Sequence, residues 1–235
     1  MAEEFAIRKE IALSATPEEV WEAIATEPGL AAWFMPFPID PSSDLVTAWE
    51  PAQALATRTP PGPDGSTQAF EYLIVAKDGG STVLRFVHRG FRDDDWSDEF
   101  EPMTGAGWDM YLYTLSQYLT HFAGRPATYV EAEGPASSAQ PGCWSRLLGR
   151  LDPSGSIAEG SEVQVALPGL APITGMVDYL TPHFVGLRTP DALIRFHGRW
   201  PIGMTVAVSH HAYAEGTDVA ATSAAWSTWL AQTLA

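Results

Sequence analysis

Two β-favouring segments separated by a short turn constrain this chain most strongly. Residues 69–76 and 82–88 are rich in β-branched and aromatic side chains, a composition typical of strands. Between them, the sequence Lys77-Asp78-Gly79-Gly80 has the residue types of a short hairpin turn. The pattern predicts an antiparallel strand pair, which any fold of the first half must contain.

A strand and a capped helix are predicted before this hairpin. Apolar residues alternate over 5–13, which indicates a strand. A helix then starts with a capping box, in which Thr16 caps free backbone N–H groups, Pro17 suits the first helical position and Glu19 follows three residues after the cap. A second short helix or turn is expected over 30–34. Residues 36–65 are interpreted as loops and edge strands, with one strand over 45–50.

A long amphipathic helix is predicted over residues 107–122. Large apolar side chains recur there at helical spacing, which is the pattern of a helix with one buried face. They are Trp108, Tyr111, Leu112, Leu115, Leu119 and Phe122. We expect the first domain, residues 1–125, to end shortly after this helix.

The second half repeats the order helix, antiparallel strands, helix. Residues 126–141 are rich in glycine, proline and serine and are interpreted as a linker, with a short strand over 127–133 as the alternative. A smaller α+β domain is expected over 142–235, with helices over 144–151 and 223–234 and five strands between them. Aligning His88 with His210 also aligns helices that carry Trp108 and Trp226, which predicts a truncated, degenerate repeat of the first domain.

Composition restricts the partners and the compartment. The formal net charge of −16 repels nucleic-acid backbones and anionic lipid surfaces, so we expect no nucleic-acid binding. The single cysteine, Cys143, forms no intrachain disulfide and fits a reducing compartment. No signal peptide and no apolar run long enough to span a membrane is visible. We therefore expect a cytoplasmic protein that does not insert into membranes.

The order of these motifs resembles a known family. A strand precedes the helix start Thr16-Pro17-Glu18-Glu19-Val20-Trp21, and Pro28-Gly29-Leu30 and Trp33-Phe34 follow. The hairpin ends in Phe86-Val87-His88-Arg89-Gly90-Phe91, and Gly107-Trp108 opens the long helix. Over residues 5–122, the chain resembles the activator-of-heat-shock-protein-ATPase branch of the START-like, or SRPBCC, superfamily.

This resemblance implies an α+β helix-grip fold, in which an antiparallel sheet wraps around a long C-terminal helix and encloses a cavity. Members of the superfamily include lipid and polyketide binders, cyclases, hydrolases and co-chaperones, so the fold does not specify an activity. The sequence has no recognisable catalytic motif and implies no cofactor, which favours a binding protein for a hydrophobic small molecule. The alternatives are a cyclase, aromatase or hydrolase acting in the same cavity, and a module that stimulates a chaperone ATPase by binding a protein partner.

The first domain has more large aromatic rings than a core of its size needs, so some of these rings are candidates to line a ligand pocket. Trp33, Phe34 and Met35 lie where a gate over the cavity is expected. Tyr72 and Arg85, on the two hairpin strands, are expected to offer polar contacts inside it. His88, at the end of a strand, is placed to bind a ligand or act as a base, although a structural histidine is the simpler interpretation. The set is Trp33, Phe34, Tyr72, Arg85, His88, Trp108 and Tyr111.

No metal site is predicted. The six histidines have no neighbours at a recognised ligand spacing, and the adjacent His210 and His211 should point to opposite faces of a strand. The acidic run within residues 92–101 lacks the order of an EF-hand loop and is interpreted as a solvated loop.

Overall fold

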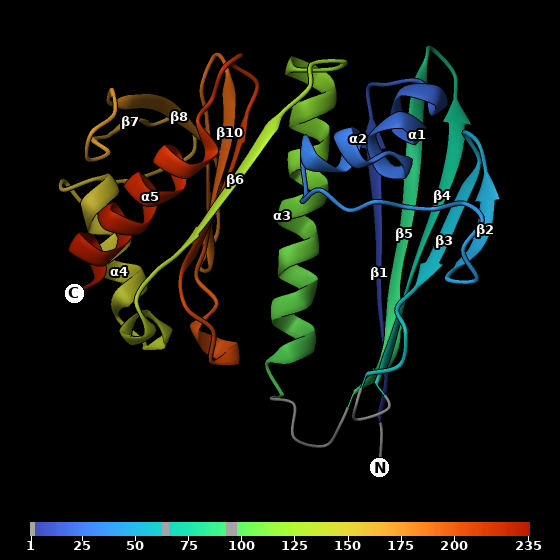
Figure 1. Cartoon of the computed structure of the whole chain (residues 1–235), viewed down its shortest axis with the longest axis horizontal. Coiled ribbons are helices and arrows are strands. Elements are labelled where there is room, and N and C mark those ends of the chain that lie inside the picture. The colour runs from blue at the N-terminus through green and yellow to red at the C-terminus, as the bar shows by residue number, and fades with distance from the viewer. Residues whose placement is uncertain (1–2, 63–65, 93–97) are drawn as a thin grey trace. The chain divides into compact units, whose positions relative to one another are not determined.

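The computed structural model describes residues 3–62, 66–92 and 98–235, and it divides the chain into two compact units (Figure 1). The first unit ends at Pro126 and the second begins at Ala127. Each unit is an α+β structure built on one antiparallel sheet. The predicted fold class is therefore confirmed, and each unit is described below by itself.

Among its described residues, the first unit contains five strands and three helices. Its strands are β1 (Glu3–Leu13), β2 (Val46–Glu50), β3 (Ala54–Arg58), β4 (Thr67–Lys77) and β5 (Ser81–Arg92). Its helices are α1 (Pro17–Ala25), α2 (Glu27–Ala31) and α3 (Phe100–His121). The strands are ordered β1-β5-β4-β3-β2, so the first strand of the unit pairs with the last.

The local signals in the sequence explain the elements of this unit. The Thr16 hydroxyl accepts a hydrogen bond from the backbone N–H of Glu19, whose carboxylate accepts one from the backbone N–H of Thr16. The hairpin between β4 and β5 turns through Gly79 and Gly80, whose φ angles are 77° and 73°, values that residues with a Cβ rarely adopt. The predicted capping box and hairpin are thus both present.

Two elements of the first unit differ from the prediction. Helix α3 begins at Phe100, seven residues before the expected start, and includes Pro102 in its first turn, where the missing N–H has no intrahelical partner to lose. Strand β3 lies in a segment expected to hold loops and edge strands, but it is an interior strand that pairs with both β2 and β4. Strands β3 and β2 extend the sheet past β4 to its edge (Figure 1), and residues of both line the site described below.

The second unit consists of six strands, two α-helices and two 3-10 helices. Its strands are β6 (Thr128–Glu133), β7 (Glu162–Val165), β8 (Ile173–Leu180), β9 (Phe184–Arg188), β10 (Ala192–His197) and β11 (Ala207–Ala212). The helices are η1 (Ala136–Ala139), α4 (Cys143–Leu151), η2 (Trp200–Ile202) and α5 (Val219–Leu234).

The segment interpreted as a linker, residues 126–141, holds the strand β6 and the helix η1. Strand β6 pairs along its whole length with β11, with Val130 opposite His210. Because β11 supplies a complete ladder of hydrogen-bonding partners, a segment between glycine- and proline-rich stretches becomes an edge strand. This result corrects the linker interpretation in favour of the strand alternative.

The two units share one topology. The second sheet is ordered β6-β11-β10-β9-β8-β7, so again the first strand pairs with the last, which precedes the long helix. Helices α4 and α5 bury their apolar faces against this sheet around Trp144, Phe196 and Trp226. The second unit therefore has a helix-grip arrangement of its own, with one more strand than the first.

Candidate functional site

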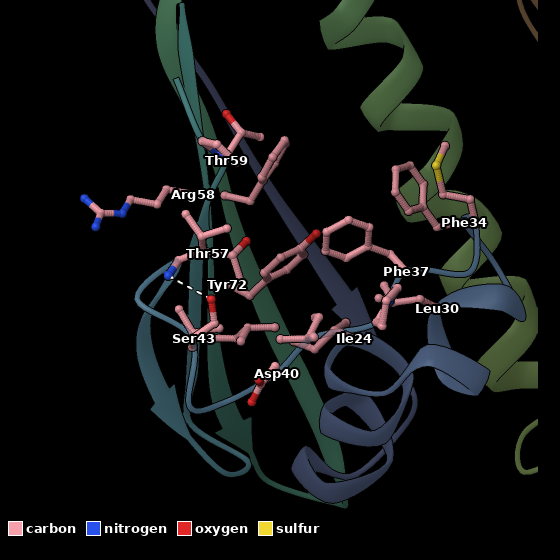
Figure 2. A pocket seen from close by; sticks show the side chains of 18 of the residues that line it. Ile24, Leu30, Phe34, Phe37, Asp40, Ser43, Thr57, Arg58, Thr59 and Tyr72 are labelled. Atoms are coloured by element: carbon pink, nitrogen blue, oxygen red, sulfur yellow. Dashed lines mark hydrogen bonds between the residues drawn. The ribbon is translucent and has the colours of Figure 1, made fainter. Parts of the chain in front are cut away.

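A cavity of about 450 Å³ lies in the first unit, between the sheet and the helices. Its walls come from α1, α2, the segment after α2, strands β2 to β4 and α3. Figure 2 shows Ile24 and Leu30 on one side of the space, Tyr72 on the sheet side and Phe34 on the helix side. Most of the side chains that line it are apolar, including Leu55 of β3. The cavity is suited to an apolar molecule of modest size.

The indole of Trp108 organises the aromatic wall of this cavity. Its ring lies 4.1 Å from the ring of Phe86, centroid to centroid, and it stacks on Phe34 at 5.5 Å. Phe70 approaches it from the sheet at 6.1 Å. The predicted residues Phe34 and Trp108 therefore lie together at the cavity, because α3 brings the tryptophan onto the sheet beside the segment that follows α2.

The hydroxyl of Tyr72 is the polar group of the cavity on which the functional argument depends. The residue is only 8% exposed, and its ring packs against Phe86 with centroids 5.0 Å apart. Its hydroxyl is directed into the cavity toward Phe37 (Figure 2). Among the described residues, none forms a hydrogen bond with that hydroxyl. Burial raises the pKa of Tyr72 above its ordinary value, so the group is a neutral phenol able to donate or accept one hydrogen bond.

His88 is held by the protein and does not line the cavity. Its Nδ1 accepts a hydrogen bond from Nε1 of Trp108 at 3.0 Å, and its Nε2 lies 2.9 Å from Oε1 of Gln68. Phe70 stacks on the imidazole at 4.5 Å. Burial lowers the pKa of His88 to about 4, so the ring is neutral near pH 7. Both ring nitrogens are occupied, and the structural interpretation of this histidine describes it better than a catalytic one.

Arg85 lies on the opposite face of the sheet from the cavity, which corrects the expectation that it contacts a ligand there. Its guanidinium pairs with the carboxylate of Glu10 at 2.7 Å, and its side chain is 54% exposed. The reason is strand parity, since neighbouring residues of a strand face opposite sides. Leu84 and Phe86 are fully buried, so Arg85 between them must face outward.

Trp33 and Tyr111 are also placed outside the cavity lining. Trp33 is fully buried, and its indole N–H donates to the carbonyl of Ala23 at 2.9 Å, which ties the end of α2 to α1. Tyr111 is half-buried and meets the ring of Phe34 edge to face at 4.7 Å. Both residues pack against the ring of Phe34. Neither lines the space where a ligand would lie.

The mouth of the cavity was anticipated only in part: the sequence placed Met35 in the expected gate and counted Phe37 among the large rings, but neither was chosen as a candidate ligand-binding residue. Phe37 and Met35 are 56% and 38% exposed, although both are large and apolar, and both line the cavity. Thr57 and Thr59 line it from β3 and the residue after it, in a region interpreted as loops and edge strands. The available signal was the run Phe34-Met35-Pro36-Phe37, whose apolar residues lie in a proline-containing loop that no predicted helix or strand would bury.

Other sequence expectations concern metals and membranes. Across residues 3–62, 66–92 and 98–235, no cluster of three or more His, Cys, Asp or Glu side chains is arranged to hold a metal ion. Residues 93–97 of the acidic run lie outside the described residues. None of the helices within the described ranges is both long enough and apolar enough to cross a membrane.

Comparison with known proteins gives structural matches only. No protein-family model and no curated protein matches the sequence. Protein MLL2253 from Mesorhizobium loti is 22% identical, with a TM-score of 0.42 over 50% of this chain and 98% of that chain. The Aha1 dimer from Colwellia psychrerythraea is 19% identical, with a TM-score of 0.40 over 49% and 96%.

Some of the structural matches extend over both units. The di-domain ARO/CYC BexL from the BE-7585A biosynthetic pathway is 12% identical, with a TM-score of 0.41 over 98% of each chain. At these identities the likenesses concern the fold and do not identify an activity.

Proposed function

We propose that the first unit binds an apolar small molecule in its cavity, oriented by one hydrogen bond to the hydroxyl of Tyr72. The observation that carries this proposal is a buried phenol, directed into an apolar space, that has no hydrogen-bond partner among the described residues. The hydroxyl itself is not sealed away from the cavity, so a bound molecule can reach it. A ligand oxygen at this position would form the hydrogen bond that the protein leaves open, so the cavity favours an apolar body with one hydroxyl or carbonyl group.

The size of the cavity is sufficient for useful affinity. Burial of apolar surface contributes about 25 cal/mol per Å², so a ligand that buries about 300 Å² gains about 7.5 kcal/mol before the costs of association. The exposed apolar side chains at the mouth, Met35 and Phe37, extend the apolar surface outward, with Phe37 beside the Tyr72 hydroxyl (Figure 2). They are placed to cover a bound molecule.

The same geometry favours binding over catalysis. Of the three polar candidates, His88, Tyr72 and Arg85, the last faces away from the cavity and His88 has both ring nitrogens engaged. The pKa of Tyr72 is raised by burial, so its phenolate is less accessible than that of a free tyrosine. None of these three groups is prepared to act as a base near pH 7.

The proposal is tested with 2-naphthol, an apolar bicyclic molecule with one hydroxyl, and with naphthalene, which lacks it. Calorimetric titration of the full chain should show that Tyr72→Phe weakens 2-naphthol binding about tenfold, the effect of one hydrogen bond in an apolar site. Naphthalene binding should change little, because it makes no hydrogen bond. Arg85→Ala is the matched control and should bind both probes as the wild type does.

Two results would overturn the proposal. One is that neither probe binds the wild-type chain. The other is that Tyr72→Phe and Arg85→Ala bind 2-naphthol equally well. Native mass spectrometry of the freshly purified protein complements the titration, because a copurified apolar molecule that Phe37→Ser loses would identify the natural ligand.

A further inference from the structure

The second unit contains a cavity of its own, of about 520 Å³, whose lining residues all belong to that unit. It lies where the β9–β10 turn, the end of β11 and the start of α5 meet. Its polar lining includes His210, Asp191 and Asp218, and its apolar lining includes Leu167 and Ile173. The cavity of the first unit contains no described histidine in its lining, so the chemistry of this second space differs.

The tautomer of His210 is set by Trp226. Nε1 of Trp226 lies 3.1 Å from Nδ1 of His210, and an indole nitrogen is a donor only. Nδ1 must therefore carry a lone pair. Burial lowers the pKa of His210 to about 4, against the opposing effect of the Asp191 carboxylate. Near pH 7 the ring is neutral, and its single proton resides on Nε2.

The Nε2–H group of His210 is a donor without a protein acceptor. The residue is 7% exposed and lines the cavity. None of the described residues accepts a hydrogen bond from this nitrogen, which is not sealed away from the cavity. In the first unit, the corresponding nitrogen of His88 lies 2.9 Å from the amide oxygen of Gln68. Both units thus contain a Trp–His pair, but the second ring nitrogen of the histidine has a protein partner only in the first unit, as far as the described residues show.

Acceptors lie in the same cavity. Oδ1 of Asp191 accepts a hydrogen bond from the hydroxyl of Thr189 at 2.8 Å, and Oδ1 of Asp218 accepts one from the backbone N–H of Ala221 at 3.0 Å. The second carboxylate oxygen of each residue has no donor among the described residues. Two carboxylates facing one space repel an anionic ligand and favour one that donates hydrogen bonds.

We infer that the second unit binds an uncharged small molecule in which a hydroxyl group stands beside a carbonyl or second hydroxyl oxygen. Nε2–H of His210 donates to one ligand oxygen, and the carboxylate of Asp191 accepts from the ligand hydroxyl. Leu167 and Ile173 contact the carbon skeleton. This site is independent of the one proposed for the first unit, since the two cavities share no residue.

The test uses the full chain labelled with ¹⁵N at histidine and titrated with 3-hydroxybutanone, the smallest probe with the required pair of oxygens. Two-bond ¹H–¹⁵N spectra report which ring nitrogen carries the proton, and a His210→Asn variant assigns the signals. We expect His210 to be protonated at Nε2, and its signals to shift saturably at millimolar probe while those of His88 stay unchanged.

Two comparisons make the result specific. Asp191→Asn keeps the side-chain shape and should bind 3-hydroxybutanone about tenfold more weakly, because a hydrogen bond to a carboxylate is lost. Butanone, which lacks the hydroxyl, should bind the wild type and Asp191→Asn with the same low affinity. The 3-hydroxybutyrate anion should bind more weakly than 3-hydroxybutanone.

The inference is wrong if His210 carries its proton on Nδ1, or if 3-hydroxybutanone leaves the His210 signals in place. Equal binding by Asp191→Asn and the wild type would also overturn it. Because these signals report on the second unit only, failure here leaves the Tyr72 site untouched, and failure of the 2-naphthol experiment leaves this site untouched.

Discussion

The indole N–H of Trp108 donates a hydrogen bond to Nδ1 of His88 across 3.0 Å, joining the long helix of the first unit to the last strand of its sheet. The second unit has the same bond at 3.1 Å between Trp226 and His210. In each case the histidine lies on the strand that pairs with the first strand of its unit, and the tryptophan lies on the helix that follows. This equivalence supports the internal repeat more directly than the few matching residues do.

The Trp108–His88 bond should contribute measurably to stability. Replacing Trp108 with Phe removes the donor, leaves Nδ1 of His88 buried without a partner and opens a small cavity, so we expect a loss of about 2–3 kcal/mol. Trp49→Phe is the control, because Trp49 is half-buried and packs edge to face on Trp21, and it should cost under about 1 kcal/mol. Urea unfolding measures both. Equal midpoints for the two variants would contradict the role given to this bond.

Stability should fall as the solution is acidified through the histidine range. The pKa values of His88 and His210 are both lowered to about 4, whereas an unfolded histidine titrates near about 6.5. Between these values the unfolded chain binds more protons than the folded one, so the free energy of unfolding decreases as pH falls from 6.5 toward 4. Each histidine contributes up to about 1.4 kcal/mol per pH unit in that window.

Unfolding midpoints at several pH values, together with an NMR titration of the two histidine side chains, measure this effect. Neither ring should titrate between pH 8 and 5. A titration of His88 or His210 near pH 6.5 would mean that its ring is solvated, and the expected loss of stability would then be absent.

Much of the fold could be predicted because its signals are local. The capping box at Thr16 and the glycines of the hairpin fix short segments whatever surrounds them. Strand β3 was missed because Ala54-Leu55-Ala56-Thr57-Arg58 has few residues that favour strands, and its pairing depends on β2 and β4. Strand β6 was interpreted mainly as a linker because its pairing depends on β11, which lies far along the sequence.

The site was less predictable than the fold. Side-chain alternation alone places Arg85 on the opposite face of β5 from the residues on either side of it. In the register between β4 and β5, Tyr72 lies opposite Phe86 and Leu73 lies opposite Arg85. Residues directly opposite each other share a face of the sheet, so only one of the two polar candidates could enter the cavity. The partners of His88 were beyond sequence reasoning, because Gln68 and Trp108 reach it only through the folded sheet and helix.

Gly186 should tolerate no side chain. A methyl group there would lie 2.5 Å from Nη1 of Arg195 and 2.5 Å from Oδ1 of Asp178, which form an ion pair at 2.8 Å. Gly186→Ala must therefore displace a buried charge pair, and we expect a loss of about 3 kcal/mol or more. Gly149→Ala is the control in the same unit, because its added methyl would meet nothing within 4 Å apart from its chain neighbours and the backbone of its own helix.

Gly149 lies inside α4, so alanine there should raise stability by about 0.5–1 kcal/mol. Thermal unfolding of the two variants gives shifts of opposite sign if this account is correct. A Gly186→Ala protein as stable as the wild type would show that the ion pair can move aside without cost.

The mouth of the first cavity should affect binding without affecting folding. Phe37 is 56% exposed, so Phe37→Ala removes little buried surface and should change the free energy of unfolding by under about 0.5 kcal/mol. It also removes a ring that lies beside the Tyr72 hydroxyl and would cover a bound molecule, so 2-naphthol affinity should fall about three- to tenfold. Leu73→Ala, on the other face of the sheet and 45% exposed, should leave that affinity unchanged. If both variants bind 2-naphthol like the wild type, Phe37 does not cover the ligand. If Leu73→Ala weakens binding as much as Phe37→Ala does, the probe binds outside the cavity.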